Sequence, residues 1–198
     1  MQEKDVNFTN QRVVNSHPII QGVFLMTNIT LIACVNQLGG MSNKGEALFQ
    51  IPSDLKRFKE ITDKQIVVMS RKMYEYIIAK NGSPLLNRLN VVITTDKSYK
   101  EQVDSDVIVY NSVEPILKQC INEVGRDDRE VFVIGGEQIF KQFINYADRV
   151  ELTVVDDTST TFDKAFPMEQ LNKFQVVNRI KSRPDETPPY EVVIYKRT

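Results

Sequence analysis

Apolar residues in this 198-residue chain form short runs, separated by stretches in which they recur with helical spacing. Residues 29–35 are a near-continuous apolar run, which is typical of a strand buried on both faces of a sheet. Four shorter runs rich in β-branched residues follow, and we expect them to form strands: 65–69, 90–94, 106–109 and 130–134.

Between these runs, apolar residues recur at steps of three and four, the spacing of one helix face. This pattern predicts helices at 113–124 and 139–147, and a shorter one at 71–79. After a run at 150–155 the helical spacing stops, and two further strands are expected at 173–180 and 190–195, paired antiparallel across a proline-rich connection. Such alternation implies right-handed crossovers and predicts an α/β fold with a doubly wound, mostly parallel sheet.

The first 25 residues differ from the rest of the chain, with weak periodicity and many asparagines and glutamines. Met26 leads directly into the first predicted strand, as a natural protein start would. We therefore expect residues 1–25 to be a loose extension, an alternative start or a short packing arm. Residues 26–198 are expected to form one domain, since a chain of this length can bury a sizeable core.

Composition excludes several classes of function. Acidic and basic residues nearly cancel (26 against 25) and the pI is about 5.9, which argues against a general nucleic-acid surface. No apolar run approaches the ~18 residues that span a bilayer, and the start lacks the order of a secretory signal. Cys34 and Cys120 lie in apolar segments without metal-ligand spacing, so we expect small core residues in a reducing cytoplasm. The expected protein is cytoplasmic, metal-free and a monomer or homodimer, and binds small molecules.

The only histidine, His17, lies in the unusual N-terminal stretch. Serine–histidine and cysteine–histidine catalysis, and histidine-rich metal sites, are therefore unfavoured. Any acid–base chemistry must run through carboxylates, tyrosines, lysines or water.

One carboxylate stands out, in the first turn of a helix that Pro52 begins after a glycine-rich loop. Asp54 lies just before the helix face that Leu55 and Phe58 share. A carboxylate there offers two acceptor oxygens in one plane, which suits a flat heterocycle with two neighbouring N–H groups. An acid at a helix start is also favoured by the macrodipole, so this residue alone leaves both interpretations open.

Two strand-to-helix junctions are candidate phosphate sites, because ligands of doubly wound sheets bind at the carboxyl ends of the strands. Gly135 and Gly136 lie between a buried strand and a helix, where a backbone without side chains lets a pyrophosphate approach. The full Gly-x-Gly-x-x-Gly spacing is absent. Arg71 and Lys72 place two cations at another helix start, which favours an anion between them. A tight turn and a solvated surface pair remain the alternatives.

Four segments together resemble the dihydrofolate reductase family, in family order and spacing from about residue 26 to the end: 51–59, 67–75, 133–140 and 161–167. The resemblance implies a single-domain doubly wound sheet with an antiparallel C-terminal strand. It also implies NADPH-dependent reduction of 7,8-dihydrofolate to tetrahydrofolate, in support of one-carbon and thymidylate metabolism. Two alternatives stay open: a related-fold pyrimidine reductase of the riboflavin pathway, and a non-catalytic binding or assembly protein.

Individual roles follow from the same resemblance. Asp54 matches the acid that binds the pterin and supports protonation at N5, with Thr153 linked to it. Arg88 matches the arginine that holds the folate glutamate through a bidentate fork. Gly135 and Gly136 match a pair joined by a cis peptide. The implied substrate-binding residues are Ala33, Phe49, Ile51, Asp54, Leu55, Phe58, Arg88, Ile134 and Thr153. The implied NADPH-binding residues are Gly40, Ser42, Ser70, Arg71, Lys72, Met73, Thr94, Thr95, Gly135, Gly136, Glu137, Gln138 and Ile139.

The chain also departs from the family pattern. The usual Leu-Pro-Trp before the helix is Ala47-Leu48-Phe49, and the chain contains no tryptophan. Met73 replaces a cofactor-binding threonine, Ser70 replaces a glycine, and Asp96 stands where a phosphate-binding base is often found. These departures concern cofactor affinity and the preference for NADPH over NADH more than the fold.

Overall fold

The computed structural model describes residues 29–118 and 129–198. The predicted extension 1–25, with His17, lies outside the described residues, as does Cys120. The predicted helix 113–124 is described only in part, with residues 114–118 helical.

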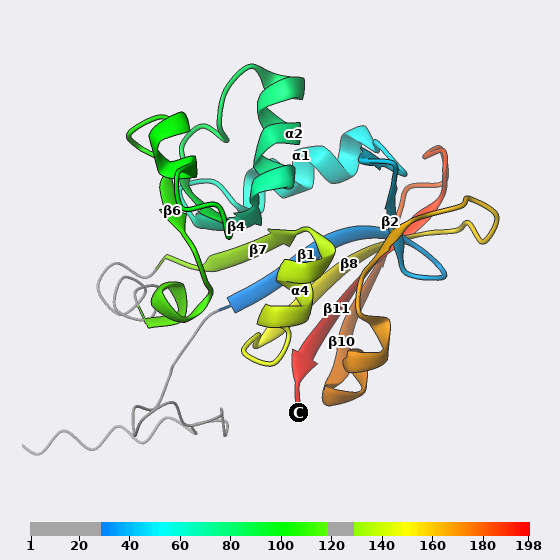
Figure 1. The fold of residues 1–198 in the computed structure, drawn as a ribbon. Helices are drawn as coiled ribbons and strands as arrows, with labels where there is room; N and C mark the ends of the chain where they lie inside the picture. The colour runs from blue at the N-terminus through cyan, green and yellow to red at the C-terminus, as the bar shows by residue number, and fades with distance from the viewer. Residues whose placement is uncertain (1–28, 119–128) are drawn as a thin grey trace, which may run out of the picture.

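Within the described residues, eight strands form one sheet in the order β10-β11-β8-β1-β7-β4-β5-β6 (Figure 1). The pairs from β8 to β6 are parallel, whereas β11 pairs antiparallel with both β8 and β10. The strands are β1 Ile29–Asn36, β4 Ile66–Ser70, β5 Leu89–Ile93, β6 Ile108–Tyr110, β7 Val131–Gly135, β8 Arg149–Val155, β10 Phe174–Lys181 and β11 Tyr190–Arg197.

The sequence-based prediction of a doubly wound, mostly parallel sheet with an antiparallel C-terminal pair is confirmed. Every predicted strand is present, with bounds that differ by at most two residues. The predicted helix 71–79 is α2, Arg71–Asn81, which ends at Gly82 with a positive φ of 73°. The predicted helix 139–147 is α4, Glu137–Phe143, and is shorter at its end. Its apolar spacing continues because Ile144 and Ala147 are still fully buried in the following turn.

Side-chain alternation along the strands divides the core into two layers. One layer contains Leu31 and Val35 of β1 and packs against Phe140 and Phe143 of α4. The other contains Ile32 of β1 and packs against α2 and the helix α1, Pro52–Ile61. Figure 1 shows α1 and α2 on one face of the sheet and α4 on the other. The face under α1 is the one that carries the candidate site.

A second, smaller sheet was not expected from the sequence. It has the order β3-β2-β9, with β2 Gly40–Asn43, β3 Glu46–Ala47 and β9 Lys164–Ala165. Strands of two to four residues are too short to show alternation, and β9 pairs with β2 across more than a hundred residues. Two short 3₁₀ helices lie outside both sheets, η1 Tyr99–Gln102 and η2 Met168–Lys173.

The helix α1 lies over the sheet without burying any residue completely. Pro52 begins it, where the missing N–H costs no hydrogen bond, and Asp54 lies in its first turn. At the other end the fully buried Thr62 donates through its hydroxyl to the carbonyl of Phe58 at 2.7 Å. A helix with this exposure covers a site rather than filling a core. Among the described residues, no helix is long and apolar enough to cross a membrane.

Candidate active site

A hydrogen bond between helix and sheet fixes the position of Asp54. The hydroxyl of Thr153, on β8, donates to Oδ1 of Asp54 at 2.5 Å. Thr153 is almost fully buried and Asp54 is half-buried. Burial raises the pKa of the Asp54 carboxyl above its ordinary value, while the Thr153 hydrogen bond and the charge of Arg57 act in the opposite direction. The site therefore holds a carboxyl group that keeps its proton to a higher pH than a solvated aspartate.

Cys34 lies beside this carboxyl, on β1. It is the register partner of Thr153 and is half-buried, so it is not the core residue that its apolar segment predicted. Burial, and to a lesser extent the charge of Asp54, raise the pKa of its thiol to about 12. Cys34 is therefore a neutral thiol at physiological pH. The alternation that puts Leu31 and Val35 in the opposite layer could have placed Cys34 on this face.

The start of α1 is also tied to β11. The hydroxyls of Ser53 and Tyr190 are 2.8 Å apart and share a hydrogen bond. Two strands, β8 and β11, thus hold the first turn of α1 from below. Nothing in the sequence marked Tyr190 for this role, because the contact joins residues 137 positions apart.

The predicted wall of the substrate pocket is assembled only in part. Ile51 is buried at the start of α1, while Leu55 is 48% exposed on its outer side. Phe58 and Ile134 belong to the same core layer under α1 and α2. Phe49 is half-buried, two residues before the helix cap. Ala33 does not join them, because it packs in the opposite layer with Leu31 and Val35.

Arg88 lies at the other end of α1 with its guanidinium already oriented. Its Nε donates to the Thr62 hydroxyl at 3.0 Å, and Nη1 and Nη2 donate to the carbonyls of Leu86 and Lys59, both at 2.5 Å. Arginine has five N–H groups, so each terminal nitrogen keeps one for a ligand. These two terminal nitrogens could bind a carboxylate in a bidentate manner.

The separation of Asp54 and Arg88 along α1 sets the length of a ligand that could contact both residues. Asp54 is five residues before Lys59 and eight before Thr62, the two contacts of Arg88 on α1. At 1.5 Å per residue, this corresponds to about 8–12 Å along the helix axis. A ligand with two N–H groups at one end and a carboxylate at the other, separated by a flat spacer, fits this span.

The glycine pair lies at the end of β7 and contacts the start of α2. The peptide between Gly135 and Gly136 is cis, as the family resemblance implied. The amide of Gly136 donates to Oγ of Ser70 at 3.3 Å, and the same oxygen caps α2 by accepting from the amide of Met73. Gly135 has a φ of 114°, and a Cβ there would lie 3.1 Å from the ring of Phe140. Glycine is therefore required at Gly135.

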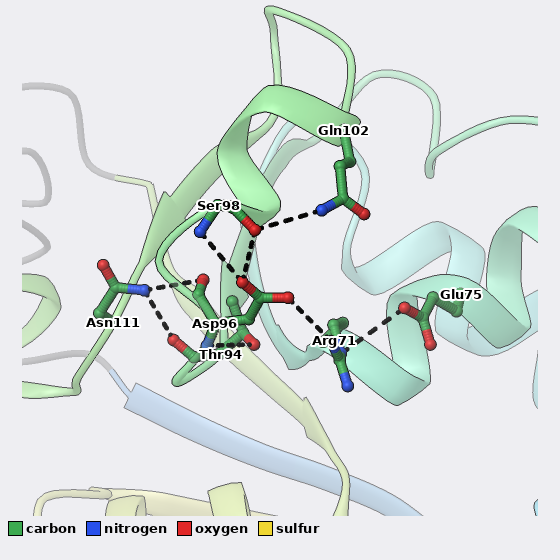
Figure 2. A network of polar contacts seen from close by, with 7 residues as sticks. All are labelled: Arg71, Glu75, Thr94, Asp96, Ser98, Gln102 and Asn111. Carbon is green, nitrogen blue, oxygen red and sulfur yellow. Dashed lines mark hydrogen bonds and ion pairs between the residues drawn. The ribbon is translucent and has the colours of Figure 1, made fainter.

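A polar network, drawn in Figure 2, joins the start of α2 to the end of β5. Arg71 contacts Asp96 at 3.2 Å and Glu75 at 3.6 Å. Oδ1 of Asp96 accepts from both the amide and the hydroxyl of Ser98, which together with Arg71 hold the pKa of this carboxyl below its usual range. Arg71 is therefore paired with two carboxylates, and its predicted place beside a phosphate stays a prediction.

The loop that carries Gly40 is set by one buried side chain. Oδ1 of Asn36, at the end of β1, accepts from the amides of Gly40 at 2.7 Å and Leu38 at 3.1 Å. A Cβ on Gly40 would lie 2.4 Å from the ring of Phe162, which belongs to the segment 161–167. The predicted cofactor residues Gly40 and Ser42 are both in β2, paired there with β9.

Comparison with known proteins gives a consistent result. A sequence model described as dihydrofolate reductase matches residues 28–197. This chain belongs to the dihydrofolate reductase family. The dihydrofolate reductase of Bacillus subtilis is 31% identical over 164 residues, which cover 82% of this chain and 89% of the relative. That of Buchnera aphidicola is 32% identical over 163 residues, covering 82% and 93%. A solved dihydrofolate reductase from Enterococcus faecalis, complexed with NADP(H) and RAB-propyl, has a TM-score of 0.72 at 25% identity, over 86% of this chain and 96% of that one.

In this family member the predicted cofactor residues other than Gly40 and Ser42 lie at one edge of the main sheet. The neighbouring parallel strands β7, β4 and β5 end respectively at Gly135, Ser70 and Ile93. The segments that follow those ends carry the remaining predicted positions at this edge: Arg71, Lys72, Met73, Thr94, Thr95, Gly136, Glu137, Gln138 and Ile139. Thr94 is buried and accepts through its hydroxyl from the amide of Asp96, whereas Lys72 and Thr95 are exposed.

A cavity elsewhere does not coincide with this site. It has a volume of about 610 Å³, lies against β8, β10 and β11, and includes none of the predicted site residues in its lining. Arg179 in its wall pairs with Glu191 at 2.6 Å, and Asp156 accepts from Gln37 at the same distance. Four of the polar side chains in its wall are thus paired with one another.

The raised pKa of Asp54 predicts a specific dependence of stability on pH. A carboxyl whose pKa is higher in the folded state than in the unfolded state favours folding when protonated, and that contribution is lost as pH rises from about 4 through the folded-state pKa. Asp54→Asn carries no charge and keeps an oxygen for Thr153. It should be more stable than the wild type at pH 7, and the difference should vanish below about pH 4. Urea unfolding at both pH values measures this, and a variant less stable than the wild type at pH 7 would contradict it.

Proposed function

We propose that this protein catalyses the NADPH-dependent reduction of 7,8-dihydrofolate to 5,6,7,8-tetrahydrofolate. The observation that carries the proposal is the arrangement along α1, with a half-buried Asp54 at one end and the oriented fork of Arg88 at the other. Dihydrofolate has the matching chemistry, since its pterin presents two neighbouring N–H groups and its glutamate presents a carboxylate. Tetrahydrofolate is the carrier of one-carbon units, so the reaction supports one-carbon and thymidylate metabolism.

Asp54 has the acceptor capacity that this role requires. Its Oδ1 is used once, by Thr153, which leaves Oδ2 and a second lone pair for the pterin N–H groups. Because burial raises its pKa, the carboxyl can hold a proton near the ring at a pH where a solvated aspartate would have lost it. The hydrogen bond from Thr153 fixes the orientation of the carboxyl group.

The residues at the carboxyl ends of β7, β4 and β5 fit NADPH. Parallel strands present ligands at this edge, and here three adjacent strands bring together a glycine backbone, hydroxyl groups and cations. Arg71 and Lys72 would face the phosphates of the adenosine end, while Gly135 and Gly136 allow close approach of the chain to the cofactor. When bound, NADPH supplies the hydride that reduces the pterin, and the protein orients the two rings and excludes water.

The two alternatives are less well supported. A pyrimidine reductase or a non-catalytic relative would not need Asp54 and Arg88 at the two ends of α1. The family match over residues 28–197 also favours dihydrofolate reduction. The loss of the usual tryptophan leaves Phe49 in its place, which can cover a ring face but donates no hydrogen bond.

We also propose that residues 1–25 are an extension separate from the catalytic domain. The support is that the family match begins at residue 28, after this extension. Cytoplasmic location, monomeric or homodimeric state and the absence of nucleic-acid partners stay predictions from the sequence.

The direct test is oxidation of NADPH, followed by absorbance with and without dihydrofolate. Asp54→Asn should keep the fold and lower the rate about 10²- to 10⁴-fold, the usual effect of removing a positioned acid–base group. Glu60→Gln, which removes an exposed carboxylate from the same helix, is the matched control and should keep the wild-type rate. Unchanged turnover of Asp54→Asn at pH 7 would rule out this role.

Arg88 is expected to act on binding rather than chemistry. Arg88→Leu removes the charge-assisted fork and should raise the KM for dihydrofolate about 10- to 100-fold, with a much smaller effect on kcat. A dihydropterin without the glutamate should respond little to the change. Equal losses for both substrates would show that Arg88 acts only through its contacts with Thr62, Leu86 and Lys59.

Asp96 is expected to weaken the preference for NADPH over NADH. Its carboxylate repels the additional phosphate of NADPH and pairs with Arg71. Asp96→Asn should tighten the binding of NADPH about two- to fivefold while leaving the binding of NADH nearly unchanged. Because the pair of Asp96 and Arg71 is exposed, added salt should reduce this gain in NADPH affinity. Dissociation constants for both cofactors measure the effect, with Glu101→Gln as a control on neighbouring η1. Equal tightening of both cofactors would argue against this assignment.

A further inference from the structure

A buried charge cluster lies under α1, next to Asp54. Glu151 of β8 is 4% exposed and receives two arginines, Arg57 of α1 on Oε2 and Arg149 on Oε1. Two guanidinium groups and one carboxylate leave a net positive charge. Buried charges of this kind are costly to desolvate, so their contribution to stability is small or unfavourable. The cluster therefore calls for another explanation.

The cluster and the Asp54 carboxyl belong to the same row of side-chain contacts between α1 and β8. Asp54 and Arg57 are three residues apart on α1, which is about 4.5 Å along its axis. Their partners Thr153 and Glu151 are two residues apart on the same face of β8, about 6.6 Å. Asp54 pairs with Thr153 while Arg57 pairs with Glu151. Arg57 is thus held one helical turn from Asp54.

The hydrogen bonding of Arg57 is incomplete. Its Nη1 is buried and has no hydrogen-bond partner within residues 29–118 and 129–198. A buried donor without a partner is rare and costs stability. Its retention beside the catalytic carboxyl indicates a role for the charge rather than for packing.

We propose that Arg57 is a positioning residue that sets the protonation equilibrium of Asp54, and that Glu151 holds it at the required distance. Closer approach would form a direct ion pair and occupy the oxygens that the substrate needs. Without Arg57, the carboxylate of Asp54 would lack a nearby positive charge. The inference rests on the proposed role of Asp54 in dihydrofolate reduction.

The other groups facing Asp54 do not supply this charge. Cys34 of β1 is a neutral thiol, and Thr153 of β8 offers only a hydroxyl, while Tyr190 of β11 shares a hydrogen bond with Ser53. Arg149 pairs with the other oxygen of Glu151, its side chain is 45% exposed, and it does not act on the pKa of Asp54 as Arg57 does. Arg57 is a cation that lowers the pKa of Asp54 against the dominant effect of burial. Burial lowers the pKa of Arg57 itself, and the charge of Asp54 opposes that shift.

The test measures the titration of Asp54 in the full chain by NMR, with aspartate labelled at the ¹³C carboxyl and the resonance assigned with Asp54→Asn. Arg57→Met should raise the Asp54 titration midpoint by about one pH unit, the low end of the effect of a nearby opposite charge. Glu151→Gln leaves the positive charge of Arg57 unopposed and should lower the midpoint. The pH profile of NADPH oxidation should move in the same two directions.

Three further variants serve as a control, a conservative replacement and a substitute for Arg57→Met. Lys56→Met removes the same charge from the exposed side of α1 and should leave the midpoint unchanged. Arg57→Lys should restore the wild-type midpoint, and Arg57→Gln replaces Arg57→Met if the latter does not fold. Shifts in one common direction, or none beyond that of Lys56→Met, would overturn the inference. A wild-type protein that does not reduce dihydrofolate would instead refute the proposed function, because the titration does not depend on activity.

Discussion

The hydrogen bond from Thr153 to Asp54 is the contact on which the rest of the site depends. It joins residues 99 positions apart and fixes the first turn of α1 against the centre of the sheet. Since a helix is rigid along its axis, this one contact also determines where Arg88 meets the far end of α1. The acid, the apolar wall and the carboxylate fork are thereby held in one line. A site built in this way can bind an elongated ligand without rearranging.

The charged groups at the two ends of α1 are placed where the helix dipole favours them. The acid lies at the N-terminal end, where partial positive charge accumulates, and the guanidinium of Arg88 lies against the C-terminal carbonyl of Lys59. Both charges are thus favoured by the helix that separates them. Burial acts against the charge of Asp54, so its protonation reflects a balance between desolvation, Thr153 and Arg57.

Much of this arrangement could be predicted because it is encoded locally. Apolar runs predicted the strands within two residues, and Pro52 with Asp54 predicted the start of α1. The contacts that could not be predicted join distant residues. Glu151 looks like an exposed strand residue until Arg57, 94 positions earlier, is placed against it. Cys34 was misassigned to the core because its apolar neighbours face the other layer. The pairing of Arg71 with Asp96 likewise required the packing of α2 beside the end of β5.

The central claim is that Asp54 binds the pterin edge while Thr153 holds it in place. A crystal structure of the full chain with NADP⁺ and folate measures this most directly. We expect two pterin N–H groups within hydrogen-bond distance of the Asp54 carboxyl, an intact contact to Thr153, and the glutamate carboxylate on Nη1 and Nη2 of Arg88. A pterin bound away from Asp54, or a carboxyl that turns from Thr153 to reach it, would contradict the claim.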